Sequence, residues 1–266
     1  MQFDPAEHLR RFSDRIARHR FINWTLSVHT RVDVEVQPAL DYLLLSKSQV
    51  SLRDMWLCAT ARVLRDRPLF NLRFNGFRDL KPVEDIHLRV GLKLDDGRLG
   101  YVVVEHADRL NPEDMARRIA ELMPQAMPPE YVAHPPRHRA GRLGRLVDDL
   151  EESTFDYAPH LEKTLGGDSG SEAGTFMVLD AGAFGAEDFH QLVLRPAVAV
   201  LVVMKPKSLL VKSPEGPVLT TRLPMAVPFC HKVMDTDGPG YFLFDLEKRL
   251  ADPQGTLGAG RGEGGP

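Results

Sequence analysis

The run AVAVLVVM at residues 197–204 decides how the chain is expected to fold. A strand with one solvent-facing side alternates apolar and polar residues, but every residue of this run is apolar. The run therefore predicts a central strand that is buried on both faces. Apolar and β-branched segments around it predict further strands at residues 175–179, 208–212, 217–221 and 225–230. We therefore expect the last third of the chain to supply most of a sheet.

Helical and extended patterns are mixed in the part of the chain that precedes this region. Residues 51–66 predict a helix in which Ser51 caps the first turn, with Asp54 three residues later as in a capping box. Residues 87–94 and 99–105 predict the strands of a hairpin around an Asp-Asp-Gly turn. Because helices and strands do not alternate strictly, the pattern favours an α/β layered sandwich with a mixed sheet and helices packed on it.

The composition excludes several classes of protein. The 266 residues include 34 basic and 37 acidic side chains, a net charge of −3 that argues against a protein dominated by nucleic-acid binding. Two cysteines are too few for a disulfide framework or a zinc ribbon. No apolar run is long enough for a membrane span, and the N-terminus has no signal-peptide pattern. We therefore expect a cytoplasmic protein with no membrane and no nucleic-acid partner.

The segment FCHKVMD at residues 229–235 is the most informative candidate for chemistry. It places His231 at the end of an apolar strand, and histidine is the natural general base near neutral pH. From the residues alone, His231 is either this base or a structural histidine. Side chains of neighbouring strand residues point to opposite faces, so Cys230 and His231 predict neither a metal site nor a nucleophile–base pair.

From about residue 5 to 252, the chain resembles the catalytic domain of the dihydrolipoamide acyltransferases of 2-oxoacid dehydrogenase complexes, a fold shared by chloramphenicol acetyltransferase. The matching segments occur in the family's order. They are residues 51–54 with 67–71, residues 85–91 with the turn at Asp96 and Gly97, residues 106–110 (HADRL, like DADRL), residues 174–176 with 182–185 (like GGTFTISNLGMFG), residues 195–201 (like NPPQAAILGVG) and residues 229–235 (like FDHRVVDG).

The resemblance implies a mechanism and an assembly. In that family, the histidine deprotonates a thiol of coenzyme A or dihydrolipoamide, the thiolate attacks an acyl carbonyl, and a hydroxyl of a neighbouring subunit stabilises the oxyanion. The site lies between subunits of a trimer. Carried over, His231 is the general base, and Asp235 holds the geometry of the site with Arg11, Arg15 or Arg18. Coenzyme A is then a substrate and a homotrimer the assembly; no residue is assigned to bind the coenzyme, and no metal is expected.

The chain also departs from the family pattern at several positions. The family hydroxyl falls on Leu179 and the next motif asparagine on Asp180; Cys230 replaces the aspartate before the histidine, Thr236 replaces the final glycine, and Val202 and Met204 replace the glycines of LGVG. Residues from about 127 to 173 form an insert. Its basic stretch at 137–145 is either a solvated loop or a docking surface for an acidic partner or for the phosphates of coenzyme A. The GGDSGSEAG loop at 166–174 lacks the lysine and spacing of a P-loop.

Two functions follow from these observations. The first is a CoA-dependent acyltransferase that moves an acyl group between coenzyme A and a thiol (lipoyl) or small-molecule acceptor. The alternative is a catalytically inactive protein of the same fold that acts as a structural or regulatory component of a 2-oxoacid dehydrogenase-type complex. In either case the expected organisation is an acyltransferase-like domain at 1–252 and a disordered glycine-rich tail at 253–266, with no lipoyl domain of its own. Lipoylated proteins or dehydrogenase-complex subunits are the expected partners.

Overall fold

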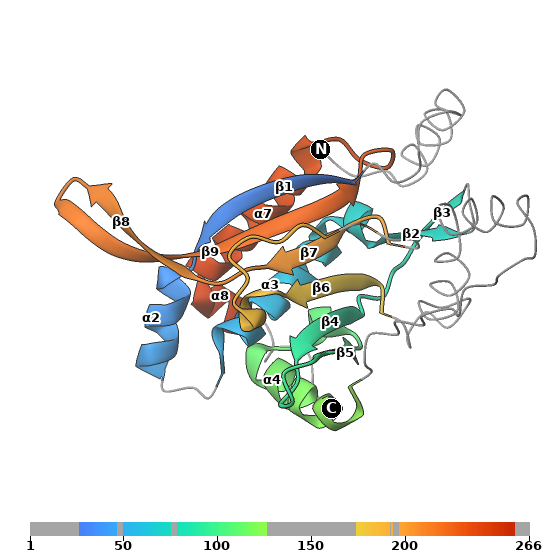
Figure 1. Ribbon diagram of the computed structural model, residues 1–266, viewed down its shortest axis with the longest axis horizontal. Helices are drawn as coiled ribbons and strands as arrows, with labels where there is room; N and C mark the ends of the chain where they lie inside the picture. Colours follow the sequence, from blue (N-terminus) through green and yellow to red (C-terminus); the bar gives the residue numbers. More distant parts are fainter. Residues whose placement is uncertain are drawn as a thin grey trace, which may run out of the picture.

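A mixed sheet of seven strands forms the centre of the protein (Figure 1). This computed structural model describes residues 27–46, 50–75, 79–126, 174–191, 193 and 197–258. The strand order is β1-β9-β7-β6-β4-β5, and β8 pairs with β9 beyond this path. The strands are β1 (Ser27–Glu35), β4 (Leu88–Lys93), β5 (Leu99–Val104), β6 (Phe176–Asp180), β7 (Val200–Val203), β8 (Lys207–Ser213) and β9 (Gly216–Cys230). Strand β6 runs parallel to β4 and β7, and the other pairs are antiparallel.

The predicted central strand is confirmed. Strand β7 lies between β9 and β6, and all four of its residues are buried. The predicted hairpin is confirmed as β4 and β5, which pair from Leu88 with Val104 to Lys93 with Leu99. The prediction of two separate strands at 217–221 and 225–230 was wrong, because Arg222, Leu223 and Pro224 continue the pairing with β1. These residues join the two segments into one long strand.

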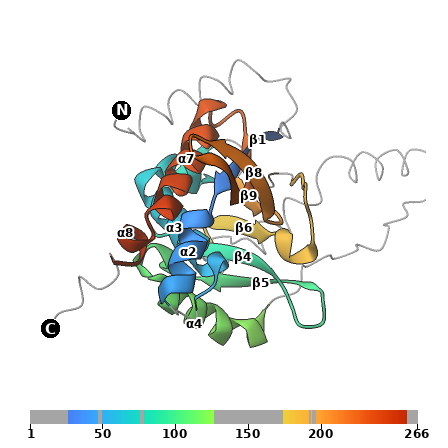
Figure 2. The same cartoon turned by 90° about the vertical axis from the view of Figure 1, so that its left-hand side faces the viewer.

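Helices cover one face of the sheet (Figure 2). They are α2 (Gln37–Ser46), α3 (Leu52–Asp66), α4 (Pro112–Leu122), α7 (Asp237–Ala251) and α8 (Pro253–Gly258). The predicted capping box is confirmed, because the Asp54 carboxylate accepts the Ser51 N–H at 2.9 Å and Ser51 Oγ accepts the Asp54 N–H. Between sheet and helices, Phe242 of α7 packs 4.7 Å from Phe70 and 6.0 Å from Phe176, measured between ring centroids. A short hairpin of β2 (Leu72–Asn75) and β3 (Asp79–Pro82) lies beside this core.

The two faces of the sheet are packed differently. Alternate strand residues point to opposite faces. Val178, Leu201 and Val227 join the large core under the helices, whereas Leu179 and Val202 join a second, smaller apolar cluster with Ala181, Val200, Met204 and Ala226. The face that the helices leave uncovered is therefore itself apolar around β6 and β7.

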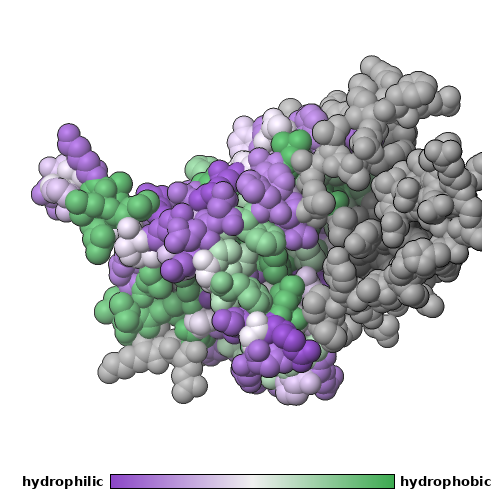
Figure 3. Space-filling model, viewed as in Figure 1, coloured by the Kyte–Doolittle hydropathy of each residue, from purple (hydrophilic) through white to green (hydrophobic). Residues whose placement is uncertain are grey.

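Exposed apolar side chains gather where the β8–β9 hairpin projects from the body (Figures 1 and 3). Five of them lie on the hairpin: Leu209, Leu210, Val211, Val218 and Leu219. Leu44 and Leu45 of α2 are also exposed, at 78% and 84%. Such a patch on a surface element is typical of an interaction site.

Several predictions fall on other parts of the chain. The insert at 127–173, the N-terminal arginines and residues 259–266 lie outside the described residues. The first residues of the tail expected to be disordered, Pro253–Gly258, form the short helix α8. This helix packs on α7 and α3. The Gly255 N–H donates to the Asp252 carboxylate at 3.1 Å, which ties this helix to the end of α7. No described helix is both long and apolar enough to cross a bilayer.

Candidate functional site

His231 is exposed in the turn directly after β9. The strand ends where the Cys230 N–H donates to the Val198 carbonyl at 2.8 Å, and the chain then turns as the Val233 N–H donates to the Cys230 carbonyl at 2.9 Å. The His231 ring meets the Phe229 ring edge-on, with centroids 6.2 Å apart. Phe229 is fully buried, so it anchors one side of the turn while the imidazole remains exposed. An exposed imidazole on an anchored turn is accessible to a substrate.

Asp235 ends the same turn, and α7 begins two residues later. It is exposed, and the arginines expected to pair with it lie outside the described residues. Thr236 stands where the family has glycine, but its backbone (φ −68°, ψ −20°) is in the right-handed helical region that any residue adopts. The loss of this glycine therefore introduces no backbone strain.

Leu179 lies in apolar surroundings on the face without helices. It pairs with Gly91 of β4 and Val202 of β7, and only 5% of it is exposed. A Cβ atom built on Gly91 would lie 2.9 Å from Leu179 Cδ1, so the leucine side chain fills the space above this glycine. The position expected to carry a hydroxyl thus carries a buried hydrocarbon with no hydrogen-bond donor.

Within one chain, His231 and Leu179 do not meet. Leu179 of β6 pairs with Val202 of β7, and Val202 pairs with Ala226 of β9. Ala226 precedes His231 by five residues. Five residues of strand span about 17 Å, and two strand spacings add about 10 Å across the sheet. A site that uses both positions therefore needs two copies of the chain.

Asp180 is held in the turn that follows β6. Its carboxylate accepts the Ala183 N–H at 3.0 Å, at the start of a short 3₁₀ turn (Gly182–Phe184). Burial raises the pKa of Asp180, while the Ala183 hydrogen bond and the charge of Arg53 act in the opposite direction. The Asp180 carboxylate therefore stabilises the turn that follows β6.

Sequence reasoning missed a histidine pair on the face without helices. His29 of β1 lies edge-to-face with His190, with centroids 5.1 Å apart, and Asp188 receives a 2.8 Å hydrogen bond from Arg31. Burial and the neighbouring His190 lower the pKa of His29, and its Nδ1 atom is buried without a hydrogen-bond partner among the described residues. About 160 residues separate the two histidines, so no local sequence signal joins them.

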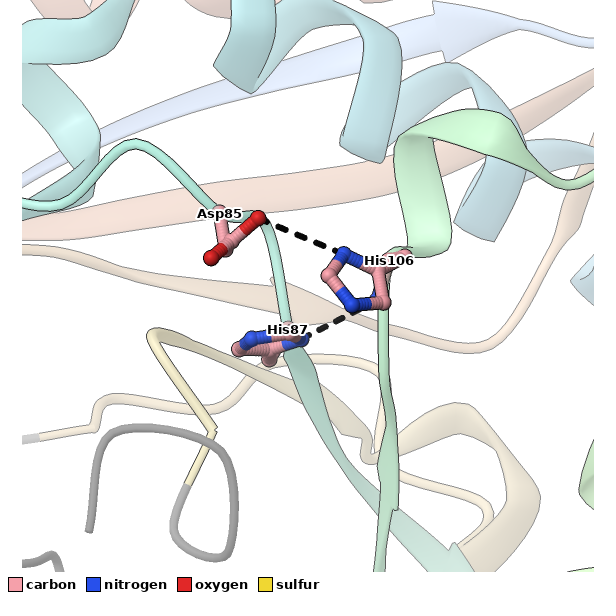
Figure 4. A group of neighbouring side chains, drawn as sticks. All are labelled: Asp85, His87 and His106. Atoms are coloured by element: carbon pink, nitrogen blue, oxygen red, sulfur yellow. Dashed lines mark hydrogen bonds and ion pairs between the residues drawn. The ribbon is translucent and has the colours of Figure 1, made fainter.

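Sequence reasoning also missed a cluster of Asp85, His87 and His106 (Figure 4). Asp85 and His87 precede β4, and His106 follows β5, so the hairpin brings them together. His106 Nδ1 lies 3.3 Å from Asp85 Oδ1, and the His106 backbone N–H donates to His87 Nδ1 at 3.0 Å. Burial, and then the nearby His106, lower the pKa of His87. Alternation of the hairpin residues was the available signal, since it predicts that the two strand ends lie side by side.

Comparison with known proteins supports the expected resemblance. No protein-family model matches the chain. One curated relative, the dihydrolipoyllysine-residue acetyltransferase component of the acetoin cleaving system of Bacillus subtilis (strain 168), is 24% identical over 199 residues. The match takes in 75% of this chain but only 41% of the relative, so the chain corresponds to less than half of that protein.

Solved structures confirm the fold. The dihydrolipoamide acetyltransferase of Azotobacter vinelandii matches with a TM-score of 0.64 and 18% identity over 97% of this chain and 93% of its own. The cubic core of the pyruvate dehydrogenase multienzyme complex matches with a TM-score of 0.61 and 19% identity, over 97% of this chain and 94% of its own. Chloramphenicol acetyltransferase matches with a TM-score of 0.52 and 16% identity, over 92% of this chain and 95% of its own. The chain therefore has the layered α/β fold of these acyltransferases, as expected.

The Azotobacter enzyme was studied for the roles of a serine, a histidine and an asparagine in its catalytic mechanism. In that enzyme, the histidine lies 52 residues after the serine and four before the asparagine. In this chain, His231 lies 52 residues after Leu179 and four before Asp235. Leu179, His231 and Asp235 are thus separated in sequence by the same numbers of residues as the three residues of that enzyme.

Proposed function

We propose that this protein is a CoA-dependent acyltransferase in which His231 is the general base. The observation that carries the proposal is the exposed imidazole of His231 on an anchored turn. It lies at the separations from Leu179 and Asp235 that the Azotobacter enzyme has for its three residues. The proposed domain covers residues 1–252, and a cytoplasmic location remains a prediction.

The proposed reaction exchanges one thioester for another. An imidazole nitrogen of His231 takes the proton from an acceptor thiol, and the thiolate sulfur bonds to the acyl carbon of an acyl-CoA. The carbonyl electron pair moves to oxygen. When the carbonyl re-forms, the bond between the acyl carbon and the CoA sulfur breaks, and the CoA thiolate takes the proton back from His231. A lipoyl thiol on another protein is the proposed acceptor, and a small-molecule acceptor is the alternative.

A homotrimer is the proposed assembly. The separation of Leu179 from His231 within one chain supports a site shared between copies, and the exposed apolar residues of the β8–β9 hairpin supply a surface to bury between them. Subunits of a dehydrogenase-type complex are the proposed further partners.

A second candidate is a catalytically inactive, structural or regulatory role in such a complex. The buried Leu179 favours it, because the expected oxyanion donor is missing. Removing one such donor from an enzyme costs about 10²–10³ in rate. A general base contributes about 10²–10⁴. A chain that retains the base and lacks the donor is thus expected to be a slow enzyme.

Acetyl transfer from acetyl-CoA to dihydrolipoamide by the purified protein tests the proposal. The native protein is expected to exceed the His231→Ala variant by about 10²–10⁴-fold. The exposed His190→Asn substitution is the matched control and should keep the native rate. Equal rates for the native and His231→Ala proteins, with both still binding coenzyme A in calorimetry, would favour the inactive role.

A further inference from the structure

The Asp85–His87–His106 cluster brings together three side chains that could hold a metal ion. One ligand atom from each residue lies within 4.8 Å of the other two (Figure 4). Nitrogen and oxygen ligands about 2.0–2.1 Å from a tetrahedral Zn²⁺ lie about 3.3 Å from each other. Asp85 Oδ1 and His106 Nδ1 are 3.3 Å apart, so these two are already at the spacing of a shared ion.

The cluster offers both nitrogen and oxygen atoms that could bind an ion. His106 Nδ1 is buried and makes no hydrogen bond among the described residues, although it faces the Asp85 carboxylate. His87 Nδ1 accepts the His106 N–H, so this nitrogen carries no proton. An ion bound there would replace that N–H as the partner of the lone pair.

The backbone fixes the cluster in place. His87 is held by Thr175, which accepts the His87 N–H through Oγ1 at 3.0 Å and donates its own N–H to the His87 carbonyl at 2.6 Å. His106 has a left-handed backbone with φ +48°, the one positive φ of a non-glycine residue among the described residues. A residue held in this unfavourable region often marks a functional position.

From these contacts we infer that Asp85, His87 and His106 bind one divalent transition-metal ion of the Zn²⁺ class. Two imidazoles and one carboxylate suit Zn²⁺, Fe²⁺ or Ni²⁺ better than Mg²⁺ or Ca²⁺, which prefer oxygen ligands. Asp85 is half-exposed, which leaves room for water or a further ligand on the ion. Arg109 lies 3.8 Å from Asp85 Oδ1 and is 67% exposed, so it has space to turn away when the ion binds. The ion would join the start of β4 to the end of β5.

Calorimetric titration of the chelator-treated full chain with Zn²⁺ tests this inference. We expect one ion to bind per chain at this site, and Mg²⁺ in excess to leave its binding unchanged. His106→Asn is the main variant, because asparagine tolerates the left-handed backbone, and Asp85→Asn is nearly isosteric. Each should weaken Zn²⁺ binding by at least about tenfold, since even residues that only orient a ligand contribute this much. His190→Asn removes an exposed histidine elsewhere and should bind as the native protein does.

A second measurement separates loss of the site from loss of the fold. Bound Co²⁺ gives visible absorption bands that report its nitrogen ligands, and the bands should weaken in His106→Asn while its circular dichroism stays native. No Zn²⁺ binding by the native protein, or unchanged affinity in both variants, would overturn the inference. Neither readout involves acyl transfer, so this result and that of the proposed function are independent.

Discussion

The turn after β9 and the middle of β6 present two halves of one candidate site, and they differ in chemistry. The turn keeps an exposed histidine, an aspartate four residues later and an aromatic anchor. Strand β6 presents Leu179, buried against Gly91 and Val202, where a hydroxyl is expected. The proposed site has therefore kept the group that moves a proton and lost the group that stabilises the oxyanion.

After the loss of His231 itself, the largest effect is expected from Leu179→Ser. A hydroxyl at this position supplies an oxyanion donor, which should raise acetyl transfer by about 10²–10³-fold. Leu179→Ala is the matched control, because it removes the same bulk without adding a donor. Equal rates for the two variants would show that space above Gly91, and not the hydroxyl, limits the reaction.

The architecture was largely predictable from the sequence, because apolar runs and capping residues act locally. The run at 197–204 identified β7, and Ser51 identified the start of α3. The continuity of β9 was not predictable, since pairing of residues 222–224 with β1 depends on a strand nearly 190 residues away.

The candidate site was only partly predictable. His231 and Asp235 could be singled out because they lie in one short motif, and the resemblance to the family assigns their expected roles. Outside the proposed acyl-transfer site, the pairing of His29 with His190 is set by tertiary packing that no local pattern encodes. The hairpin pattern predicts that Asp85 and His106 lie near one another, but not that their side chains meet. The burial of Leu179 on the face without helices also appears only once the strands are placed side by side.

A smaller effect is expected at Asp235, the other end of the turn. Asp235→Ala should lower transfer by up to about 10²-fold, the order of loss expected when a reacting group is misplaced by about 1 Å. Asp235→Asn should retain most of the activity, because the Azotobacter enzyme has asparagine at the same separation from its histidine. Steady-state rates of both variants check this, and an Asp235→Ala protein with the native rate would rule out the positioning role.

Thr236→Gly introduces the glycine of the family motif and should change the transfer rate little. The helical backbone of Thr236 needs no glycine, so the substitution adds only flexibility to the unfolded chain. We expect the free energy of unfolding to fall by roughly 0.5–1 kcal/mol in urea denaturation. A gain in stability or a large gain in rate would show that this turn is strained after all.

The smallest effect is expected from pH at the His29–His190 pair. The pKa of His29 is lowered in the folded chain, whereas an unfolded histidine has a pKa of about 6.5. Above this pH both states are neutral, but below it the unfolded chain binds the proton first, so stability falls as the pH is lowered. His29→Gln should make this loss shallower in urea denaturation between pH 7 and 5, and an identical slope would contradict the assignment.

Mixed assemblies test the central claim, that His231 and position 179 act together across two copies. A chain carrying both His231→Ala and Leu179→Ser is co-expressed with the native chain, and assemblies that contain both are isolated by two affinity tags. We predict faster acetyl transfer than in either parent assembly, because the native His231 then meets the introduced hydroxyl. A rate equal to the average of the parents, from assemblies shown to be mixed, would contradict it.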